Sequence, residues 1–401
     1  MQDIFENLSP EQTALLNLIS NNLFGTEKPI PEDLDYNKLL KESKLQAVTA
    51  VALKNIGLPE SLREKNAVLN CMSLNAGIFS HHTMLHSIME NAGIPYTVLK
   101  GAASAHYYPD PIFRAMGDVD FLVKKEDVKK ATEVLKQKGF KPWEEEHICH
   151  IVFRKDKIHL EMHFEPAGVP NGKTGDIIRE YISDMIETSS LVTNELCTFV
   201  NPDKFHHGLI MLLHMQHHLL SEGIGLRHLC DWAVFVNSFK GNEFEELFKE
   251  RLQKAGLWSF AQSISLSASI GIGLPRQDFM GDNEQLAIDL LGDIISGGNF
   301  GAKDKDRSGE GFFISNRGKD GINHSRPMQF ILSVNQIIYT HWKTAKKVKL
   351  LLPIGWVYFG SRRLIREVTG KRKPMKLKKL YSNSKNRKEL YKQLHLFETE
   401  C

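Results

Sequence analysis

Residues 96–123, YTVLKGAASAHYYPDPIFRAMGDVDFLV, contain the pattern that decides the fold of this chain. A short apolar run ends at Lys100, and after a proline-containing connection Asp118 and Asp120 lead into a second apolar run. Residues two apart on a strand point to the same face of a sheet. Two carboxylates held that close repel each other, and their usual purpose is to share a cation. We therefore expect Asp118 and Asp120 to bind a divalent metal ion.

Outward from this stretch, the sequence predicts a compact α/β unit over residues 94–166. Its expected order is strand, helix, strand, helix, strand, strand, because period-2 alternation and helical spacing follow each other along the chain. The last strand alternates: its apolar residues are Ile158, Leu160, Met162 and Phe164, and its polar residues are His159, Glu161 and His163. Glu161 is therefore the best candidate for a third carboxylate beside Asp118 and Asp120. It could bind a second metal ion or act as a general base on the group that receives a transferred phosphate.

Helical patterns dominate on both sides of this unit. We expect an α+β fold in which a small mixed sheet is flanked by N-terminal and C-terminal helical regions. The expected domains are an N-terminal helical region (1–93), an α/β core (94–200), a helical bundle (201–295), a flexible Gly-rich linker (296–327) and a basic C-terminal helical segment (328–401).

The composition excludes several classes of protein. Over 401 residues, 42% hydrophobic and 25% charged residues are ordinary for a soluble globular protein. No apolar run reaches the ~18–20 residues that a membrane helix needs, and the polar N-terminus does not resemble a secretory signal. The five cysteines form no CxxC pair, which argues against a disulfide framework or a zinc site. We therefore expect a cytoplasmic protein.

The positive charge of the chain is concentrated near its C-terminus. Residues 343–392 contain 17 Lys or Arg against 2 Glu, a net charge of +15. Such a segment favours contact with a nucleic acid or another anionic surface. The alternative is an ordinary solvated surface, since the segment matches no recognised nucleic-acid-binding module.

The residues around the two aspartates predict a site for phosphate chemistry. Metal-dependent phosphoryl or nucleotidyl transfer needs acidic metal ligands and a cradle for phosphates. Backbone N–H groups that follow the turn at Gly101 could face a phosphate. Arg114 could neutralise phosphate charge or hold the carboxylates in place. The alternative is that Asp118 and Asp120 are simple strand-end residues.

The helical half offers further candidates. His207, His214 and His218 fall on one face of a helix, where packing or contact with a substrate is favoured over metal binding because the HExxH pattern is missing. Arg227 and Asp231 are four residues apart on another helix. They could form an ion pair with each other or line the cleft opposite the carboxylates.

These motifs resemble a bacterial family of uncharacterised nucleotidyltransferases, the fifth NTP-transferase family, in the superfamily that includes DNA polymerase beta. The resemblance is carried by the Lys100-Gly101 turn, by Tyr108-Pro109-Asp110-Pro111 with Arg114, by 117–120 and by Glu161-Met162-His163, and it extends to 225–232 and to Leu352-Pro353. It implies Asp118, Asp120 and Glu161 as catalytic residues and ligands of Mg²⁺ or Mn²⁺. It also implies substrate contacts from Lys100, Gly101, Ser104, Arg114, His163, Arg227 and Asp231.

The sequence departs from the family pattern at two positions. Ala102 stands where Gly or Ser is common at the phosphate turn, so that only Ser104 can supply the hydroxyl, and Glu161 stands where Asp is usual. The resemblance implies a Mg²⁺-dependent enzyme that moves an NMP group from an NTP to an unidentified acceptor. The departures keep two alternatives open: a catalytically weak nucleotide-binding or regulatory protein with the same fold, and a scaffold that binds no nucleotide.

Overall fold

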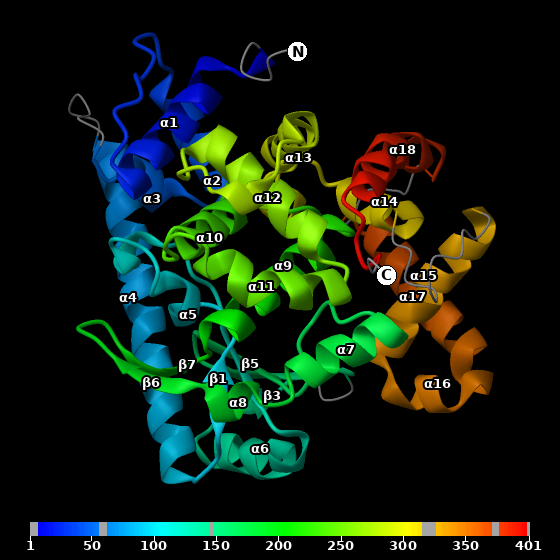
Figure 1. Cartoon of the computed structure of the whole chain (residues 1–401). Helices are drawn as coiled ribbons and strands as arrows, with labels where there is room; N and C mark the ends of the chain where they lie inside the picture. The colour runs from blue at the N-terminus through cyan, green and yellow to red at the C-terminus, as the bar shows by residue number, and fades with distance from the viewer. Residues whose placement is uncertain (1–6, 56–61, 144–146, 315–325, 371–376, 399–401) are drawn as a thin grey trace.

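The computed structural model describes residues 7–55, 62–143, 147–314, 326–370 and 377–398 (Figure 1). The N-terminal helices are α1 (Pro10–Phe24), α2 (Tyr36–Leu45), α3 (Thr49–Leu53) and α4 (Leu62–Asn91). The α/β part contains β1 (Tyr96–Val98), α5 (Ala102–Ala105), η2 (Pro111–Phe113), β2 (Val119–Val123), η3 (Lys125–Asp127), α6 (Val128–Gln137), β3 (Lys141–Pro142), β4 (His150–Lys155), β5 (Ile158–His163), α7 (Lys173–Tyr181), α8 (Met185–Thr188), β6 (Ser190–Thr193) and β7 (Thr198–Asn201).

The second half of the chain is helical. It contains α9 (Lys204–Leu219), α10 (Leu226–Val236), α11 (Glu243–Lys254), α12 (Trp258–Ile272), η4 (Asp278–Met280), α13 (Glu284–Gly297), η5 (Asn299–Gly301), α14 (Arg307–Ile314), α15 (Arg326–His341), α16 (Lys343–Lys347), η6 (Lys349–Leu351), α17 (Leu352–Val368) and α18 (Leu377–Gln393). The α+β fold with a small mixed sheet is thus confirmed.

The five-stranded sheet places the predicted carboxylates beside each other. Its strand order is β1-β2-β5-β4-β3, and β2 pairs with β5 in parallel while the other pairs are antiparallel. In the parallel pair Asp120 is the direct partner of Glu161. Paired residues in register point to the same face of a sheet. The side chains of Asp120 and Glu161 are therefore neighbours, although 41 residues separate them in the sequence.

The two faces of the sheet pack against different parts of the molecule. Val119, Phe121 and Val123 of β2 are buried in one core cluster together with residues of α4 and α6, which lie against the sheet in Figure 1. The alternate residue Leu122 belongs to the larger core formed by the helical bundle. The carboxylates share this second face, because they alternate with the residues that face α4 and α6. The site therefore lies between the sheet and the bundle.

Aromatic packing makes the bundle a rigid wall for the site. Trp232, Phe235, Phe244, Phe248 and Phe260 of α10, α11 and α12 are fully buried in its core. The indole N–H of Trp232 donates a hydrogen bond of 2.8 Å to the Ser265 hydroxyl, so its only polar atom is satisfied. Helix α10, which carries Arg227 and Asp231, is thereby held firmly beneath the sheet.

A hairpin that the sequence pattern did not indicate follows the main sheet. Strands β6 and β7 pair antiparallel. Thr97 of β1 donates a 3.4 Å hydrogen bond to the Val200 carbonyl of β7, and Phe199 is buried with the residues of α4 and the sheet. Leu191 of β6 stays exposed. With one strand half-exposed, the alternation is too weak to stand out in the sequence.

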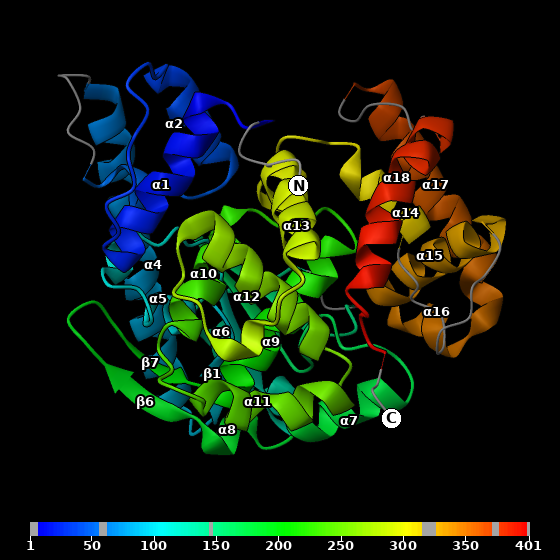
Figure 2. The same cartoon turned by 45° about the horizontal axis from the view of Figure 1, so that its top comes forward.

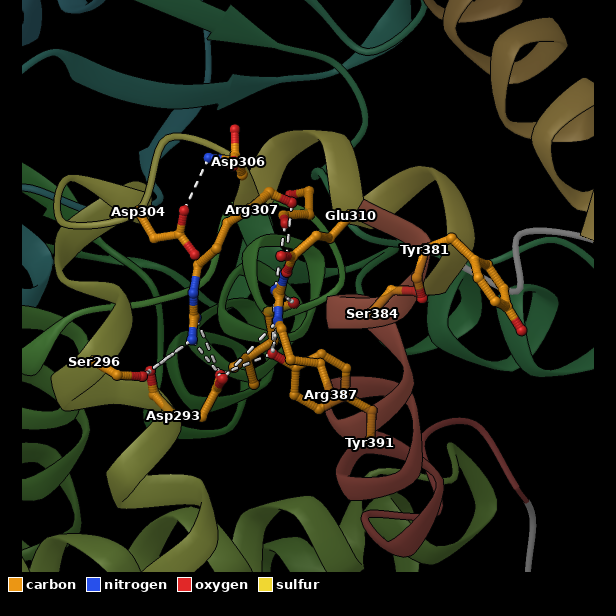
Figure 3. A network of polar contacts seen from close by, with 12 residues as sticks. Asp293, Ser296, Asp304, Asp306, Arg307, Glu310, Tyr381, Ser384, Arg387 and Tyr391 are labelled. Atoms are coloured by element: carbon orange, nitrogen blue, oxygen red, sulfur yellow. Dashed lines mark hydrogen bonds and ion pairs between the residues drawn. The ribbon is translucent and has the colours of Figure 1, made fainter. Parts of the chain in front are cut away.

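Helices α14 to α18 gather on one side of the molecule (Figures 1 and 2), and a buried polar network holds α18 there (Figure 3). Arg387 of α18 donates a 2.8 Å hydrogen bond to Glu310 of α14. The Tyr391 hydroxyl donates to Asp293 of α13 at 2.9 Å, and Arg307 of α14 pairs with the same carboxylate. Each of the two buried arginines is matched by a buried carboxylate, so the network leaves no uncompensated charge inside.

We expect Tyr391→Phe to lower the free energy of unfolding by about 1–3 kcal/mol, because it removes a hydroxyl that donates to Asp293 and accepts from Arg387 inside the network. Chemical denaturation of the full chain measures the loss. Tyr358→Phe is the matched control, since the Tyr358 side chain of α17 is 56% exposed and its hydroxyl makes no hydrogen bond within the described residues. An equal effect of the two substitutions would contradict the role of the network.

Part of the stretch expected to be a flexible linker is ordered helix. Within 296–327 the structure contains η5 and α14, and Arg307 and Glu310 of α14 are buried. Glycines and charged residues suggested a linker, but Gly309 and Gly311 pack closely on α18 and on the end of α9. Residues 315–325 lie outside the described part, and the division into domains stays a prediction.

Two expectations from composition can be compared with the described residues. The cysteines of the described residues are free thiols, namely Cys71, Cys149, Cys197 and Cys230. The sequence had argued against a disulfide framework, and these four thiols agree with that. In the described part of the chain, none of the helices combines the length and the apolar character that crossing a membrane requires.

Candidate active site

A cavity of about 300 Å³ opens between the carboxylate face of the sheet and the helical bundle. Its walls come from α5 and the turn before it, the connection to β2, strands β2 and β5, helices α9 and α10, and η5. The residues that line it are Lys100, Gly101, Ser104, Arg114, Gly117, Asp118, Asp120, Glu161, Met211, His214, Met215, His218, Arg227, His228, Asp231 and Phe300. Every predicted site residue except His163 lines this cavity, and His163 contacts two of the lining carboxylates.

Asp120 is the most strongly bound of the three carboxylates. Its Oδ1 atom lies 2.9 Å from the ammonium of Lys100 and 3.2 Å from Nε2 of His163. Burial alone would raise the pKa of Asp120, but the Lys100 charge and the hydrogen bond with His163 outweigh it and hold this pKa well below the usual value. Burial likewise opposes the charged form of His163, and its hydrogen bonds to Asp120 and Glu161 raise its pKa. Asp120 is therefore ionised and already adjacent to positive charge.

The pKa of Asp118 is shifted in the opposite direction from that of Asp120. Its carboxylate is about half exposed and lies 3.7 Å from Nδ1 of His159. Burial and the negative charges of Glu161 and Asp120 raise the pKa of Asp118. Three carboxylates thus crowd one edge of the cavity with Lys100 and two imidazoles as their partners, and a cation between them would relieve the repulsion.

The donor set fits a divalent metal ion. Oxygen ligands from Asp and Glu suit hard cations such as Mg²⁺ or Mn²⁺, and Lys100 already holds a positive charge beside Asp120. His150, Glu161 and His163 also form a group that could hold a metal ion, because one ligand atom from each lies within 4.8 Å of the others. Burial and the neighbouring His163 lower the pKa of His150 to about 4, so its imidazole is neutral, as a ligand must be.

The turn at Gly101 has the backbone that the sequence indicated, but its first amide is already engaged. Gly101 has φ 64°, and a Cβ atom there would come within 2.7 Å of Nε2 of His82. Only glycine fits such a position. The same imidazole nitrogen accepts a 3.3 Å hydrogen bond from the backbone N–H of Ala102. The Ala102 N–H is therefore already engaged in this arrangement, and the contact of the Gly101 turn with a phosphate stays a prediction.

Ser104 keeps the hydroxyl that Ala102 lacks. It lines the cavity from α5 and is otherwise buried, and its hydroxyl has no hydrogen-bond partner among the described residues. A buried hydroxyl that lines a cavity without a partner is suited to contact a polar substrate atom. The prediction that Ser104 replaces the hydroxyl at the phosphate turn is thus compatible with its position.

Arg114 and Asp231 form a clamp between the connection before β2 and helix α10. Arg114 donates hydrogen bonds of 2.8 and 2.7 Å from Nε and a terminal nitrogen to the two Asp231 oxygens. The Tyr108 hydroxyl donates a third, of 2.7 Å, to the same carboxylate. All three side chains are almost fully buried. The ion pair predicted as one alternative between Arg227 and Asp231 is not formed, because Arg114 takes both carboxylate oxygens.

Arg227 is left without an anionic partner. Its guanidinium lines the cavity and stacks over the Phe300 ring at 5.3 Å. Its Nε atom is buried and unpaired, and the side chain makes no hydrogen bond or ion pair with the described residues. Burial and the positive charge of Arg114 lower the pKa of Arg227. Arg227 is partly buried, and a partly buried cation without an anion in direct contact is costly, so the cavity is suited to receive an anion.

Three histidines complete the wall opposite the carboxylates. His214 and His218 of α9 lie side by side with rings 4.4 Å apart, and His228 of α10 lies 5.6 Å from His214. Burial is the largest cause that lowers the pKa of each ring, so all three are neutral. His207, predicted on the same face, packs instead on Tyr107 with ring centroids 5.3 Å apart.

Comparison with known proteins connects the part of the chain that carries these carboxylates with a protein family. A family model described as an uncharacterised nucleotidyltransferase matches residues 34–269. The chain belongs to this nucleotidyltransferase family. The match includes Asp118, Asp120 and Glu161, and it ends before the Leu352-Pro353 segment to which the resemblance was expected to extend. Comparisons with curated proteins and with solved structures gave no match.

One residue of the cavity, Phe300, lies outside the range that the family model matches. Phe300 closes the cavity from η5 with a left-handed φ of 52°, an uncommon conformation for a residue with a side chain. Sequence reasoning missed Phe300, Met211 and Met215, and it did not indicate the contact of His82 with the Gly101 turn. The one available signal for Phe300 was its position between Gly298 and Gly301, which marks a tight turn.

Proposed function

We propose that this nucleotidyltransferase is a Mg²⁺-dependent enzyme that moves a nucleoside monophosphate from an NTP to an acceptor. The observation that carries the proposal is the registered pair of Asp120 and Glu161 on β2 and β5, with Asp118 on the same cavity edge. Opposite them lie the cationic Arg227 and the neutral histidines. A cavity with carboxylates on one wall and an unpaired cation on the other suits a metal-bound polyphosphate.

Each residue has a role in this proposal. Asp118 and Asp120 would hold Mg²⁺, and Glu161 would bind a second ion or accept the proton of the acceptor hydroxyl. The bound ion would supply electrophilic stabilisation of the phosphate oxygens. Arg227 and Ser104 would contact the phosphate chain by donating hydrogen bonds. His163 would orient Asp120 and Glu161, since it lies 3.2 and 3.5 Å from them.

Transfer can be measured with α-labelled ATP, CTP, GTP and UTP. The full chain is incubated with each nucleotide and Mg²⁺, with small-molecule, protein and tRNA acceptors, and both pyrophosphate release and label transfer are followed. We expect Mg²⁺-dependent release of pyrophosphate that chelation abolishes. Calorimetry in parallel distinguishes the alternative: Mg²⁺-dependent NTP binding without pyrophosphate for any acceptor would favour a regulatory nucleotide-binding protein over an enzyme.

We expect Arg227→Ala to raise the KM for the NTP by about ten- to a hundredfold, because hydrogen bonds to charged groups contribute about 1.5–3 kcal/mol. The fold should not be weakened, because the substitution removes a partly buried charge that no ion pair compensates. Steady-state kinetics and a denaturation curve test both parts, with the exposed Lys129→Ala on α6 as control. An unchanged KM together with a lower stability would show that Arg227 is structural.

A further inference from the structure

Helix α17 is fixed on α15 by one of its faces. Gly355 is buried where an added Cβ would come within 2.6 Å of the Ile338 side chain. The indole N–H of Trp356 donates a 2.7 Å hydrogen bond to the Asn335 side chain of α15. Because these contacts come from successive positions on one side of α17, the orientation of the helix about its own axis is set.

The other face of α17 carries a stripe of exposed apolar side chains. The residues of this apolar stripe are Ile354, Val357, Tyr358, Leu364, Ile365 and Val368, and each is 56–80% exposed. They follow one another at spacings of three and four residues across the small Ser361, which places them on a single helical face. Leu350, in η6 just before the helix, is 87% exposed. An exposed apolar surface that is this continuous marks an interaction site.

Positive charge surrounds the apolar stripe. Arg362 and Arg366 lie beside it on the exposed surface of α17, and Lys346, Lys347 and Lys349 are exposed just before the helix. None of these five makes an ion pair with the described residues. Glu367 is the only acidic residue in 343–368, and Arg363 neutralises it with a 2.9 Å hydrogen bond.

We propose that the apolar stripe of α17 and its five cations bind the surface of an anionic lipid membrane. A helix with exposed aliphatic side chains on one face and Lys or Arg beside them lies in the plane of the interface, with the apolar face at the boundary between headgroups and acyl chains. The cations gain electrostatic attraction from acidic headgroups. Both the positive charge and the apolar stripe of α17 thus match an anionic membrane surface. In this arrangement α17 lies on the bilayer and does not cross it.

Two other partners fit these observations less well. A nucleic acid would use the cations through its phosphates, but it would leave the aliphatic side chains of the stripe in water. A second copy of this chain would cover the stripe, but a symmetric interface places identical surfaces together and would bring the unpaired cations of both copies close to each other. Of these three partners, the anionic lipid surface is the one that uses both the apolar stripe and the charge.

Vesicle co-sedimentation of the full chain tests the proposal. We expect the protein to sediment with vesicles of phosphatidylcholine and phosphatidylglycerol, to stay in solution with phosphatidylcholine alone, and to bind less as salt is raised. Val357→Ser combined with Leu364→Ser should weaken binding by at least about tenfold, since apolar burial is lost. Arg362→Glu combined with Arg366→Glu should weaken it by more than about thirtyfold, since each lost positive charge near the surface contributes about 1 kcal/mol and the two glutamates are repelled by the acidic headgroups.

Matched controls separate these effects from general changes of the surface. Leu74→Ser replaces a leucine of α4 that is 68% exposed, and Lys129→Glu with Lys138→Glu reverses two exposed charges at α6. Both controls should bind the anionic vesicles as the unchanged protein does. All variants change exposed side chains, so their denaturation curves should coincide.

Three results would overturn the proposal. The first is a failure of the unchanged protein to sediment with the anionic vesicles, or equal binding by the apolar variant. The second is binding to duplex DNA or RNA that depends on the arginines but not on Val357 and Leu364, without vesicle binding. The third is a dimer in sedimentation velocity that the apolar variant converts to a monomer, which would assign the stripe to a second copy.

Discussion

Asp120→Asn and Asp118→Asn are expected to abolish nucleotidyl transfer equally while they change the stability of the apoprotein in opposite directions. Loss of a metal ligand removes several kcal/mol of transition-state stabilisation, which corresponds to a rate reduction of roughly a thousandfold. Both carboxylates line the same cavity, so activity alone cannot distinguish their environments, whereas stability can.

The stability effect of Asp120 follows from its partners. Its pKa is held well below the usual value by Lys100 and His163 despite burial, so its ionised form stabilises the fold above the pKa of the unfolded chain, and this contribution is lost as the pH falls. Asp120→Asn leaves Lys100 without its counter-charge and leaves His163 paired with Glu161 alone. We expect a loss of about 3 kcal/mol near neutral pH, the low end for breaking a buried ion pair.

For Asp118 the sign is reversed. Burial and the charges of Glu161 and Asp120 raise its pKa, so its ionised form costs folding free energy above the raised pKa, and that cost disappears as the pH falls through it. Asp118→Asn removes the charge and should therefore stabilise the metal-free protein at neutral pH. Urea denaturation of both variants, with and without Mg²⁺, measures this, and Mg²⁺ should stabilise only the unchanged protein appreciably.

The matched control for both substitutions is Asp127→Asn, which removes a carboxylate outside the cavity in η3. It should leave both turnover and stability unchanged. Retained turnover in Asp118→Asn or Asp120→Asn would refute the assigned metal ligands. A loss of stability in Asp118→Asn, equal to that in Asp120→Asn, would refute the electrostatic difference between them.

The second large effect is expected at the clamp between Arg114 and Asp231. Asp231→Ala removes the acceptor of three hydrogen bonds and leaves a buried guanidinium without its counter-charge. Breaking a buried pair in this way costs about 3–5 kcal/mol. The clamp joins the connection before β2 to α10, so transfer activity should fall as well, because the two walls of the cavity lose their fixed spacing.

Variants of the clamp separate the charge from the packing. Tyr108→Phe removes one hydrogen bond to Asp231 and should cost about 1–3 kcal/mol. Arg114→Met combined with Asp231→Leu should be more stable than either single substitution, because no charge is left unpaired. Additive losses in the double variant would show that the two residues act independently, which would contradict the clamp.

The parts of this fold that depend on local pattern were predictable from the sequence. The alternation in 158–163 correctly placed Leu160 and Met162 on the core face and Glu161 and His163 on the other. The Gly-Asp-x-Asp pattern predicted that Asp118 and Asp120 lead into an apolar strand, and in the structure Asp118 directly precedes β2 while Asp120 is its second residue. Period-2 alternation and turn chemistry are local properties, and no tertiary contact overrode them here.

The parts that depend on distant contacts were not predictable in this way. Arg227 and Asp231 had the spacing of an ion pair, yet Asp231 pairs with Arg114, which lies 117 residues earlier. His82 could not be connected to Ala102 before the fold was known, since no sequence pattern encodes the hydrogen bond from the Ala102 N–H to the His82 ring. Phe300 lies outside the matched family range. Its contact with Arg227 depends on the position of η5 in the tertiary structure, which no local pattern encodes.

A crystal structure with Mn²⁺ and a non-hydrolysable NTP tests the proposed site most directly. Anomalous scattering locates Mn²⁺ without ambiguity about the ligands. We expect Mn²⁺ bound by Asp118 and Asp120, the phosphate chain in the cavity, and the Arg227 guanidinium in contact with a phosphate oxygen. The nucleotide outside this cavity, or Mn²⁺ bound by His150, Glu161 and His163 with neither aspartate as a ligand, would contradict the proposed function.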